Sequence, residues 1–237
     1  MTDPVISQSG SDADTDNWPA ARLLSAARQW ARGRYPDAIL VRELSVGNWG
    51  SASLDLGIIT GTEIIGIEIK GDGDSPTRLK LQACAYGRAA TRMWLLPAPS
   101  LQQRIFAKHV PTGWGQLEMF EGRVRNARVY ADEFEPDRLA NAPLQLTECL
   151  WKDELRSVSD RLQLASSARL RVDELQTQIA EHRPMADIRR EVVNQLRRRE
   201  WRLRYDESRI DLPDRIPEDK ANELPPMPLF ASEKFLP

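Results

Sequence analysis

Apolar residues recur with two different periods along the first half of the chain. From Asn17 to about Gly33 they are three or four residues apart, which predicts an amphipathic helix. Asn17 is its expected cap, Pro19 suits its first turn, and Tyr35 and Pro36 end it. The elements expected next are strands near 38–44, 51–59 and 63–70, a helix over about 77–91, a strand near 92–97, a helix over about 100–109, and a strand pair within 114–130 that turns at Glu121 and Gly122. This order predicts an α/β sandwich with a central mixed sheet flanked by helices.

The pattern changes after Pro143, where Arg, Leu, Glu and Gln dominate. Helices are expected at about 147–164, 169–182 and 185–204, and they form an α-helical C-terminal region. The predicted organisation is a disordered leader over 1–17, a core over 18–142, the helical region over 143–204, and an acidic, then Pro-rich tail over 205–237.

Composition narrows the classes of protein. Apolar residues make up 41% of the chain and charged residues 29%, which is ordinary for a globular protein. The net charge of -2 counts against a protein that coats nucleic acid, but not against an enzyme that touches DNA with one face. No run resembles a membrane span or a signal peptide, and Cys84 and Cys149 are expected to be buried thiols in a reducing compartment. We therefore expect a cytoplasmic protein that does not act in a membrane.

Charged residues interrupt two of the predicted strands. If Gly61 and Thr62 form a two-residue turn, counting outward places Asp55 directly opposite Glu68, with the two Cβ atoms about 4.5–5.5 Å apart. Lys70 lies one pleat further along the face of Glu68. Two carboxylates so placed repel each other unless a cation lies between them, and Mg²⁺ prefers oxygen ligands.

These charges can be explained in two ways. They could form a salt-bridge ladder on a solvent-exposed hairpin. A buried site is favoured by the apolar strands around them and by Gly66, which is expected to leave room beside Glu68. In such a site Lys70 could orient or activate a water molecule and stabilise charge on a phosphate.

The spacing of Asp55 from Glu68-Ile69-Lys70, on adjacent strands after an opening helix, resembles the PD-(D/E)xK nuclease superfamily, although Leu54 stands where the motif has proline. Gln82 and Tyr86 match the QxxxY element of its RecB-like branch. The resemblance implies a restriction-endonuclease-like sandwich. It also implies that Asp55 and Glu68 hold Mg²⁺, for which Mn²⁺ substitutes, while Lys70 assists the attacking water. Glu43 matches an additional acidic residue of many members.

The implied function is Mg²⁺-dependent hydrolysis of DNA, in repair, recombination or the biology of phages and mobile elements. Gln82 and Tyr86 would position the DNA strand. The alternative from another class is a protein of the same fold that binds DNA or a partner with little or no cleavage.

Further DNA contacts are predicted outside the centre. The candidates are Arg78, Lys80, Arg197, Arg198, Arg199, Trp201 and Arg202. A basic helix face with an adjacent tryptophan suits phosphate contact and base stacking. The alternative is a solvated helix whose arginines pair with acidic residues.

Three smaller features have plainer interpretations. Asp72 and Asp74 are expected to form a turn rather than a calcium loop, and His109 and His182 are assigned to no metal. The apolar residues of the tail could pack on their own domain, mediate a homodimer or recruit a protein partner.

Overall fold

The computed structural model describes residues 17–47, 52–87, 89–128, 143–164, 168–182, 184–203 and 205–214, and a seven-stranded mixed sheet forms its centre. The strands are β1 (Ile39–Ser45), β2 (Ser53–Ile59), β3 (Ile64–Lys70), β4 (Arg92–Pro97), β5 (Gly115–Phe120), β6 (Arg123–Arg128) and β7 (Ile210–Asp211). Their order in space is β6-β5-β4-β3-β2-β1-β7. The β3–β4 and β4–β5 pairs are parallel, and the remaining pairs are antiparallel.

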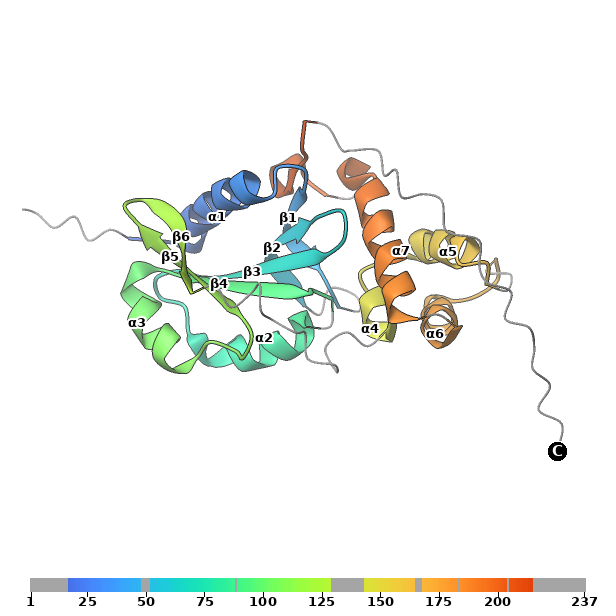
Figure 1. Cartoon of the computed structure of the whole chain (residues 1–237), viewed down its shortest axis with the longest axis horizontal. Helices are drawn as coiled ribbons and strands as arrows, with labels where there is room; N and C mark the ends of the chain where they lie inside the picture. The colour runs from blue at the N-terminus through green and yellow to red at the C-terminus, as the bar shows by residue number, and fades with distance from the viewer. Residues whose placement is uncertain are drawn as a thin grey trace, which may run out of the picture.

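Helices cover both faces of this sheet (Figure 1). They are α1 (Ala20–Arg34), α2 (Leu79–Tyr86), α3 (Pro99–Lys108), α4 (Pro143–Thr147), α5 (Lys152–Arg161), α6 (Val172–His182) and α7 (Met185–Arg198). Short 3-10 turns are η2 (Pro76–Arg78), η3 (Trp201–Leu203) and η4 (Glu207–Arg209). The predicted α/β architecture, with its central mixed sheet and its helical C-terminal region, is confirmed.

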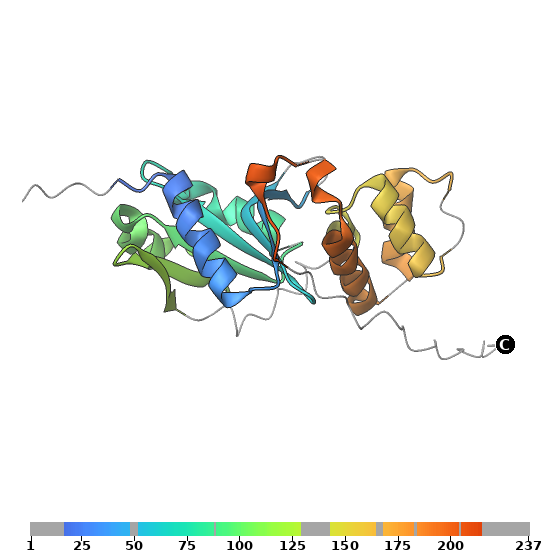
Figure 2. The same cartoon turned by 90° about the horizontal axis from the view of Figure 1, so that it is seen from above.

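The two faces of the sheet bury separate apolar clusters. Leu23, Ala27 and Ala31 of α1 pack with Ile65 and Ile67 of β3. The cluster on the other face includes residues of α2 and α3 and extends into α4, α5, α6 and α7. The helical region therefore shares a core with the sheet, and Figure 2 shows it at one end of the elongated molecule. Because helices cover both faces, every residue of β3 is buried, including its charged ones.

Several predicted boundaries were wrong. The helix expected over 77–91 ends at Tyr86, and the one over 185–204 ends at Arg198. The one over 147–164 is only Lys152–Arg161, because the separate helix α4 already ends at Thr147. The break before α5 is stabilised by Glu154, whose Oε2 accepts a hydrogen bond of 2.8 Å from the Trp151 amide. The helix α1 begins after Pro19 without a side-chain cap, so Asn17 is not its cap. Instead, the Asn17 carbonyl accepts a hydrogen bond from Arg22.

The strand β7 was not predicted. Ile210 and Asp211 pair with Val41 and Leu40 at the edge of the sheet, so residues 205–214 extend the core rather than the tail. A two-residue strand has too short a pattern to be recognised in a sequence. The leader up to residue 16 and the tail from residue 215 lie outside the described residues. Within the described ranges, no helix is long and apolar enough to cross a membrane.

Candidate active site

The β2–β3 hairpin sets the register of the candidate site. The Thr60 amide donates to the Glu63 carbonyl at 3.0 Å across the Gly61–Thr62 turn. The strand pairs then run outward to Leu56 opposite Ile67, which is the predicted register. One step further, Asp55 lies opposite Glu68. At this point the ladder opens, and the Ile69 amide donates to Asp55 Oδ2 at 2.7 Å.

A chain of hydrogen bonds connects β3 to α2. Lys70 Nζ donates to Glu68 Oε1 at 2.6 Å and to Gln82 Oε1 at 3.2 Å. Gln82 Nε2 donates in turn to the Tyr86 hydroxyl at 3.1 Å. The four-residue spacing of Gln82 and Tyr86 places both on the helix face that meets the sheet. The structure thus brings Asp55 together with the four hydrogen-bonded residues Glu68, Lys70, Gln82 and Tyr86. All five were candidate site residues in the sequence.

The acidic pair is electrostatically unfavourable as it stands. Burial, and after it the negative charge of Glu68, raises the pKa of Asp55 to about 7. Glu68 is 1% exposed, and its Oε2 has no hydrogen-bond partner among the described residues. A buried carboxylate oxygen without a partner is costly. A divalent cation between the two carboxylates would relieve both effects, so these residues fit the implied Mg²⁺.

The same two carboxylates also affect the pKa of Tyr86. Burial, and then the negative charges of Glu68 and Asp55, raise the pKa of its hydroxyl above the ordinary value. The phenol therefore remains protonated at neutral pH. It can accept a hydrogen bond from Gln82 and keep its own proton for another acceptor.

Asp55, Glu68, Lys70 and Gln82 line a cavity of about 320 Å³. Its wall consists of Ala20, Ala21, Leu24, Arg42, Glu43, Asp55, Glu68, Ile69, Lys70, Asp74 and Gln82. One water molecule takes up about 30 Å³, so the cavity has room for a hydrated ion and a phosphate group. Arg42 and the α1 residues of this wall were not foreseen. The only signal for Arg42 is its position beside Glu43 in an otherwise apolar strand.

Glu43 lines the cavity but is engaged elsewhere. By strand register it lies across from Asp55, between the pairs Arg42–Leu56 and Leu44–Leu54. Its φ of 53° breaks the strand's alternation, and its carboxylate lies 3.3 Å from Arg209 and 3.5 Å from Arg42. Within the described residues no group of three or more Asp, Glu, His or Cys gathers as a metal-ligand set. The structure thus does not bring Glu43 into one shell with Asp55 and Glu68.

Gly66 has a different role from the predicted one. A Cβ atom there would lie 2.3 Å from Met93 Sδ and 2.9 Å from Leu54 Cδ2. Core side chains therefore fill the space that was expected beside Glu68. The glycine permits close packing of β3 against its neighbours.

The arginine-rich segment divides into buried and exposed residues. Arg199 is 6% exposed and Trp201 is 2% exposed, so their predicted contact with DNA is wrong. Arg199 pairs with both oxygens of Glu154, at 2.6 and 2.5 Å, and stacks between Trp151 and Trp201. Arg197 is also buried, which removes it as a ready phosphate contact. The sequence could not show this because Glu154 lies 45 residues away.

Other predicted DNA contacts remain exposed. They are Arg78, Lys80, Arg198 and Arg202. Arg78 and Lys80 lie at the start of α2, the helix that carries Gln82 into the site. Arg202 lies 3.6 Å from Glu207, an exposed pair that contributes little to stability.

The remaining polar features are structural. Gly73 has a φ of 89°, and Asp74 accepts a hydrogen bond of 2.8 Å from the Gly71 amide, which confirms the predicted turn. Cys149 is buried, and burial raises its thiol pKa to about 12, so it is unreactive. Cys84 is free but exposed on α2, so its expected burial was wrong.

The model of the family described as bacteriophage P4 protein cII matches residues 27–211, more than three quarters of the chain. The chain belongs to this family. The matched range spans the sheet, the candidate site and the helical region, and it ends at the last residue of β7.

Comparison with other proteins adds little to the family match. No match was found among curated proteins. A solved structure of a protein of unknown function from Silicibacter pomeroyi is 23% identical, with a TM-score of 0.36. The similarity covers 48% of this chain and 72% of that protein.

Proposed function

We propose that this member of the P4 cII family is a metal-dependent deoxyribonuclease of the PD-(D/E)xK type. The observation that carries the proposal is the unpartnered Glu68 Oε2, buried beside Asp55 and Lys70 in one cavity. A buried acidic pair without a cation is unfavourable, and such sites are where proteins perturb pKa values for function. The phage family supports a role in phage or mobile-element biology, in the cytoplasm.

The residues of the site have distinct tasks in this proposal. Asp55 and Glu68 hold Mg²⁺ or Mn²⁺. The cation, when bound, would activate a water molecule and neutralise charge on the phosphate. Lys70 uses two of the three N–H donors of its ammonium on Glu68 and Gln82, which leaves one for the attacking water or a phosphate oxygen. Gln82 fixes the position of Lys70, and Tyr86, which is 3% exposed, holds Gln82 in place rather than contacting the DNA backbone.

A digestion assay tests this function. The purified protein is incubated with linear, circular and single-stranded DNA in Mg²⁺, Mn²⁺ or EDTA. Cleavage is expected with either metal and not with EDTA. Asp55→Asn and Glu68→Gln should abolish it, whereas the exposed controls Asp37→Asn and Glu200→Gln should cut normally. Undiminished cutting by either site variant would refute the assignment.

The lysine has a test of its own. Lys70→Arg keeps the charge, but the planar guanidinium hydrates differently and presents its donors in a fixed fork. We expect this variant to bind DNA and to lose most cleavage. Near-normal turnover would place Lys70 outside the chemical step.

The second candidate function is DNA or partner binding without cleavage. It is favoured by one observation, the 2.6 Å Lys70–Glu68 pair, which already neutralises one of the two carboxylates. The same digestion separates the candidates, because a binding protein would shift DNA in a gel and leave it intact in both metals.

A further inference from the structure

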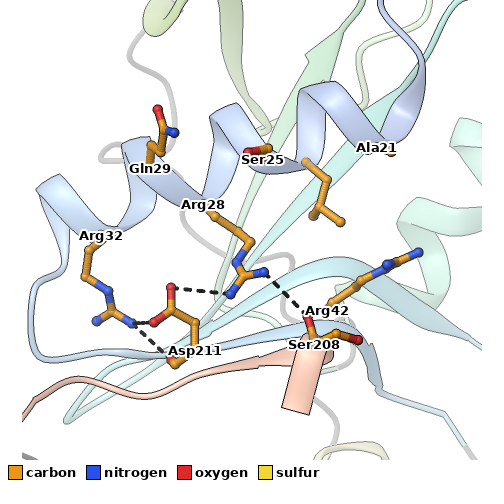
Figure 3. Close-up of a pocket in the computed structure, with 9 residues that line it drawn as sticks. Ala21, Ser25, Arg28, Gln29, Arg32, Arg42, Ser208 and Asp211 are labelled. Atoms are coloured by element: carbon orange, nitrogen blue, oxygen red, sulfur yellow. Dashed lines mark hydrogen bonds and ion pairs between the residues drawn. The ribbon is translucent and has the colours of Figure 1, made fainter. Parts of the chain in front are cut away.

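A second cavity lies beside the candidate site, between α1 and the edge of the sheet formed by β1 and β7. Its volume is about 600 Å³. Its lining consists of Ala21, Leu24, Ser25, Arg28, Gln29, Arg32, Arg42, Ser208 and Asp211. Figure 3 shows the arginines of α1 and Arg42 of β1 projecting into this space from opposite sides.

Positive charge dominates this lining. The lining contains three arginines and one carboxylate, Asp211, which gives a formal charge of +2, and Arg42 also pairs with Glu43 just outside the lining. The chain as a whole carries -2, so the charge here is local. A cavity of one sign of charge attracts ligands of the opposite sign.

The three arginines differ in how firmly they are held. Arg32 is anchored by the carbonyls of Pro36, Ala38 and Asp211 and by the Asp211 carboxylate, at 2.7 to 3.0 Å. Arg28 has only long contacts, 3.5 Å to the Ser208 carbonyl and 3.7 Å to Asp211. Arg42 lies 3.5 Å from the half-exposed Glu43. Arg32 is thus committed to the fold, whereas Arg28 and Arg42 can turn to a ligand at little cost.

The cavity continues into the candidate active site. Ala21, Leu24 and Arg42 line both. Arg42 therefore stands at the boundary between the carboxylates that would hold the metal and the arginines of α1. A ligand that occupies both cavities must carry negative charge at two separated points, as successive phosphates of a polynucleotide do.

We propose that Arg28 and Arg42 bind a phosphate of the same DNA strand next to the one at Asp55 and Glu68. The inference rests on the proposed nuclease function and specifies its substrate class. The substrate is a polynucleotide with at least one phosphate beyond the bond that is cut. Guanidinium groups suit phosphate because they donate two N–H bonds in a fixed geometry. Binding through backbone phosphate is independent of base sequence.

The experiment measures binding apart from cleavage. A fluorescein-labelled oligothymidylate is titrated with the full-length protein in Ca²⁺, and its anisotropy is recorded at several salt concentrations. Arg28→Gln/Arg42→Gln should weaken binding about tenfold and flatten the log–log salt dependence by about 0.7, the value for one lost phosphate contact on a single strand. The control is Arg104→Gln, an exposed arginine of α3 that should change neither value.

Two further measurements distinguish the loss of a phosphate contact from a general loss of folding. Arg28→Lys/Arg42→Lys keeps the charge and should retain the salt slope while losing only part of the affinity. Bis(4-nitrophenyl) phosphate is too small to reach both cavities, so Arg28→Gln, a change in the second cavity and outside the wall of the candidate active site, should hydrolyse it at the wild-type rate. A parallel loss on this small diester would overturn the subsite.

The outcomes separate the two proposals. If the wild type cuts DNA and the glutamine variant keeps its affinity, salt slope and KM, the subsite is refuted while the nuclease stands. If nothing is cut but binding still depends on Arg28 and Arg42, the phosphate site stands and the nuclease fails. If polyglutamate competes as well as oligothymidylate, the cavity is a site for acidic peptides and the inference is overturned.

Discussion

At the scale of single residues, the candidate site concentrates unfavourable electrostatics in one place. Asp55, Glu68 and Lys70 lie in two strands, β2 and β3, whose other side chains are almost all apolar. The Lys70 ammonium offsets the charge of Glu68 at 2.6 Å. For Asp55, the Ile69 hydrogen bond and the Lys70 charge lower the pKa less than burial and Glu68 raise it. The protein therefore holds an acidic group at the expense of its own stability, which is the usual property of a functional site.

The pH dependence of stability should reveal Asp55. Its pKa is about 7 in the folded chain against an ordinary value of 3.8, so the folded state binds the proton more tightly. Stability from this group is present at acid pH and is lost as pH rises from about 4 to about 7. At pH 8 without metal, Asp55→Asn should be more stable than wild type by roughly 1–3 kcal/mol, with little difference at pH 4.

Urea unfolding at pH 4 to 8 measures this difference, and Asp37→Asn serves as the control. Added Mg²⁺ should raise the Tm of the wild type at pH 8 and have a smaller effect on Asp55→Asn. Parallel pH profiles for the wild type and Asp55→Asn would contradict the unfavourable charge at this position.

The close Lys70–Glu68 pair predicts that substitutions of the two residues have non-additive effects on the free energy of unfolding. Lys70→Met leaves Glu68 buried without its counter-ion and should lower the free energy of unfolding by about 3 kcal/mol. Glu68→Gln/Lys70→Met removes both charges and should recover most of that loss. The exposed Lys80→Met on α2 should stay within about 0.5 kcal/mol of wild type. Denaturant titrations of the wild type, Lys70→Met, Glu68→Gln and the double variant test this, with Lys80→Met as the control, and additive effects would argue against a direct pair.

At the scale of elements, the arginine at the end of α7 joins this helix to α5 and does not form part of a basic surface. Arg199 pairs with Glu154 of α5 and donates a hydrogen bond of 2.8 Å to the Cys149 carbonyl. Its guanidinium also stacks on the rings of Trp151 and Trp201. The helix α7 thereby ends against the beginning of α5. Arg198 and Arg202, on the same segment, point to solvent.

Substitutions should separate these two groups. Arg199→Met leaves Glu154 buried and unpaired, and we expect a loss of about 3 kcal/mol in thermal or urea unfolding. Arg198→Gln/Arg202→Gln should stay within about 0.5 kcal/mol of wild type. If these exposed arginines contact DNA, that double variant should flatten the salt dependence by about one log–log unit per lost contact. An unchanged salt slope would leave them as a solvated surface.

At the scale of the whole molecule, the chain returns from the helical region to complete the sheet. Residues 205–214 bring β7 to the edge of β1, and Arg209 donates to the carbonyls of Arg42 and Glu43. The Asp211 carboxylate forms ion pairs with Arg28 and Arg32 of α1. Residues 205–214 therefore contact the first helix and the first strand, including residues from the walls of both cavities.

Two truncated chains isolate this contribution. A chain of residues 1–204 lacks the segment that a chain of residues 1–214 retains, so their difference measures 205–214 alone. We expect the shorter chain to have a Tm lower by about 4 °C or more, since 1 kcal/mol shifts Tm by roughly 2–4 °C at this size. It should also bind oligothymidylate more weakly, because Arg28 and Arg42 lose the neighbours that position them. Equal Tm values would show that β7 is dispensable.

Comparison of the full chain with residues 1–214 addresses the tail. Loss of a dimer or of a protein partner on truncation would assign the tail to that contact. Size-exclusion chromatography with light scattering and pull-downs from host lysate are the measurements. The homodimer and the recruited partner remain predictions until then.

The sequence by itself determined the local features. Period and turn chemistry gave the strand at 92–97, the turn at Glu121–Gly122 and the register that brings Asp55 opposite Glu68, because alternation and a two-residue turn are short-range properties. Only the tertiary structure decided which polar groups are buried. Arg199, Gly66 and Asp211 have their roles through partners far away in sequence, such as Glu154, Met93 and Arg32. No pattern within a segment records such contacts, since they arise when the sheet and its helices pack.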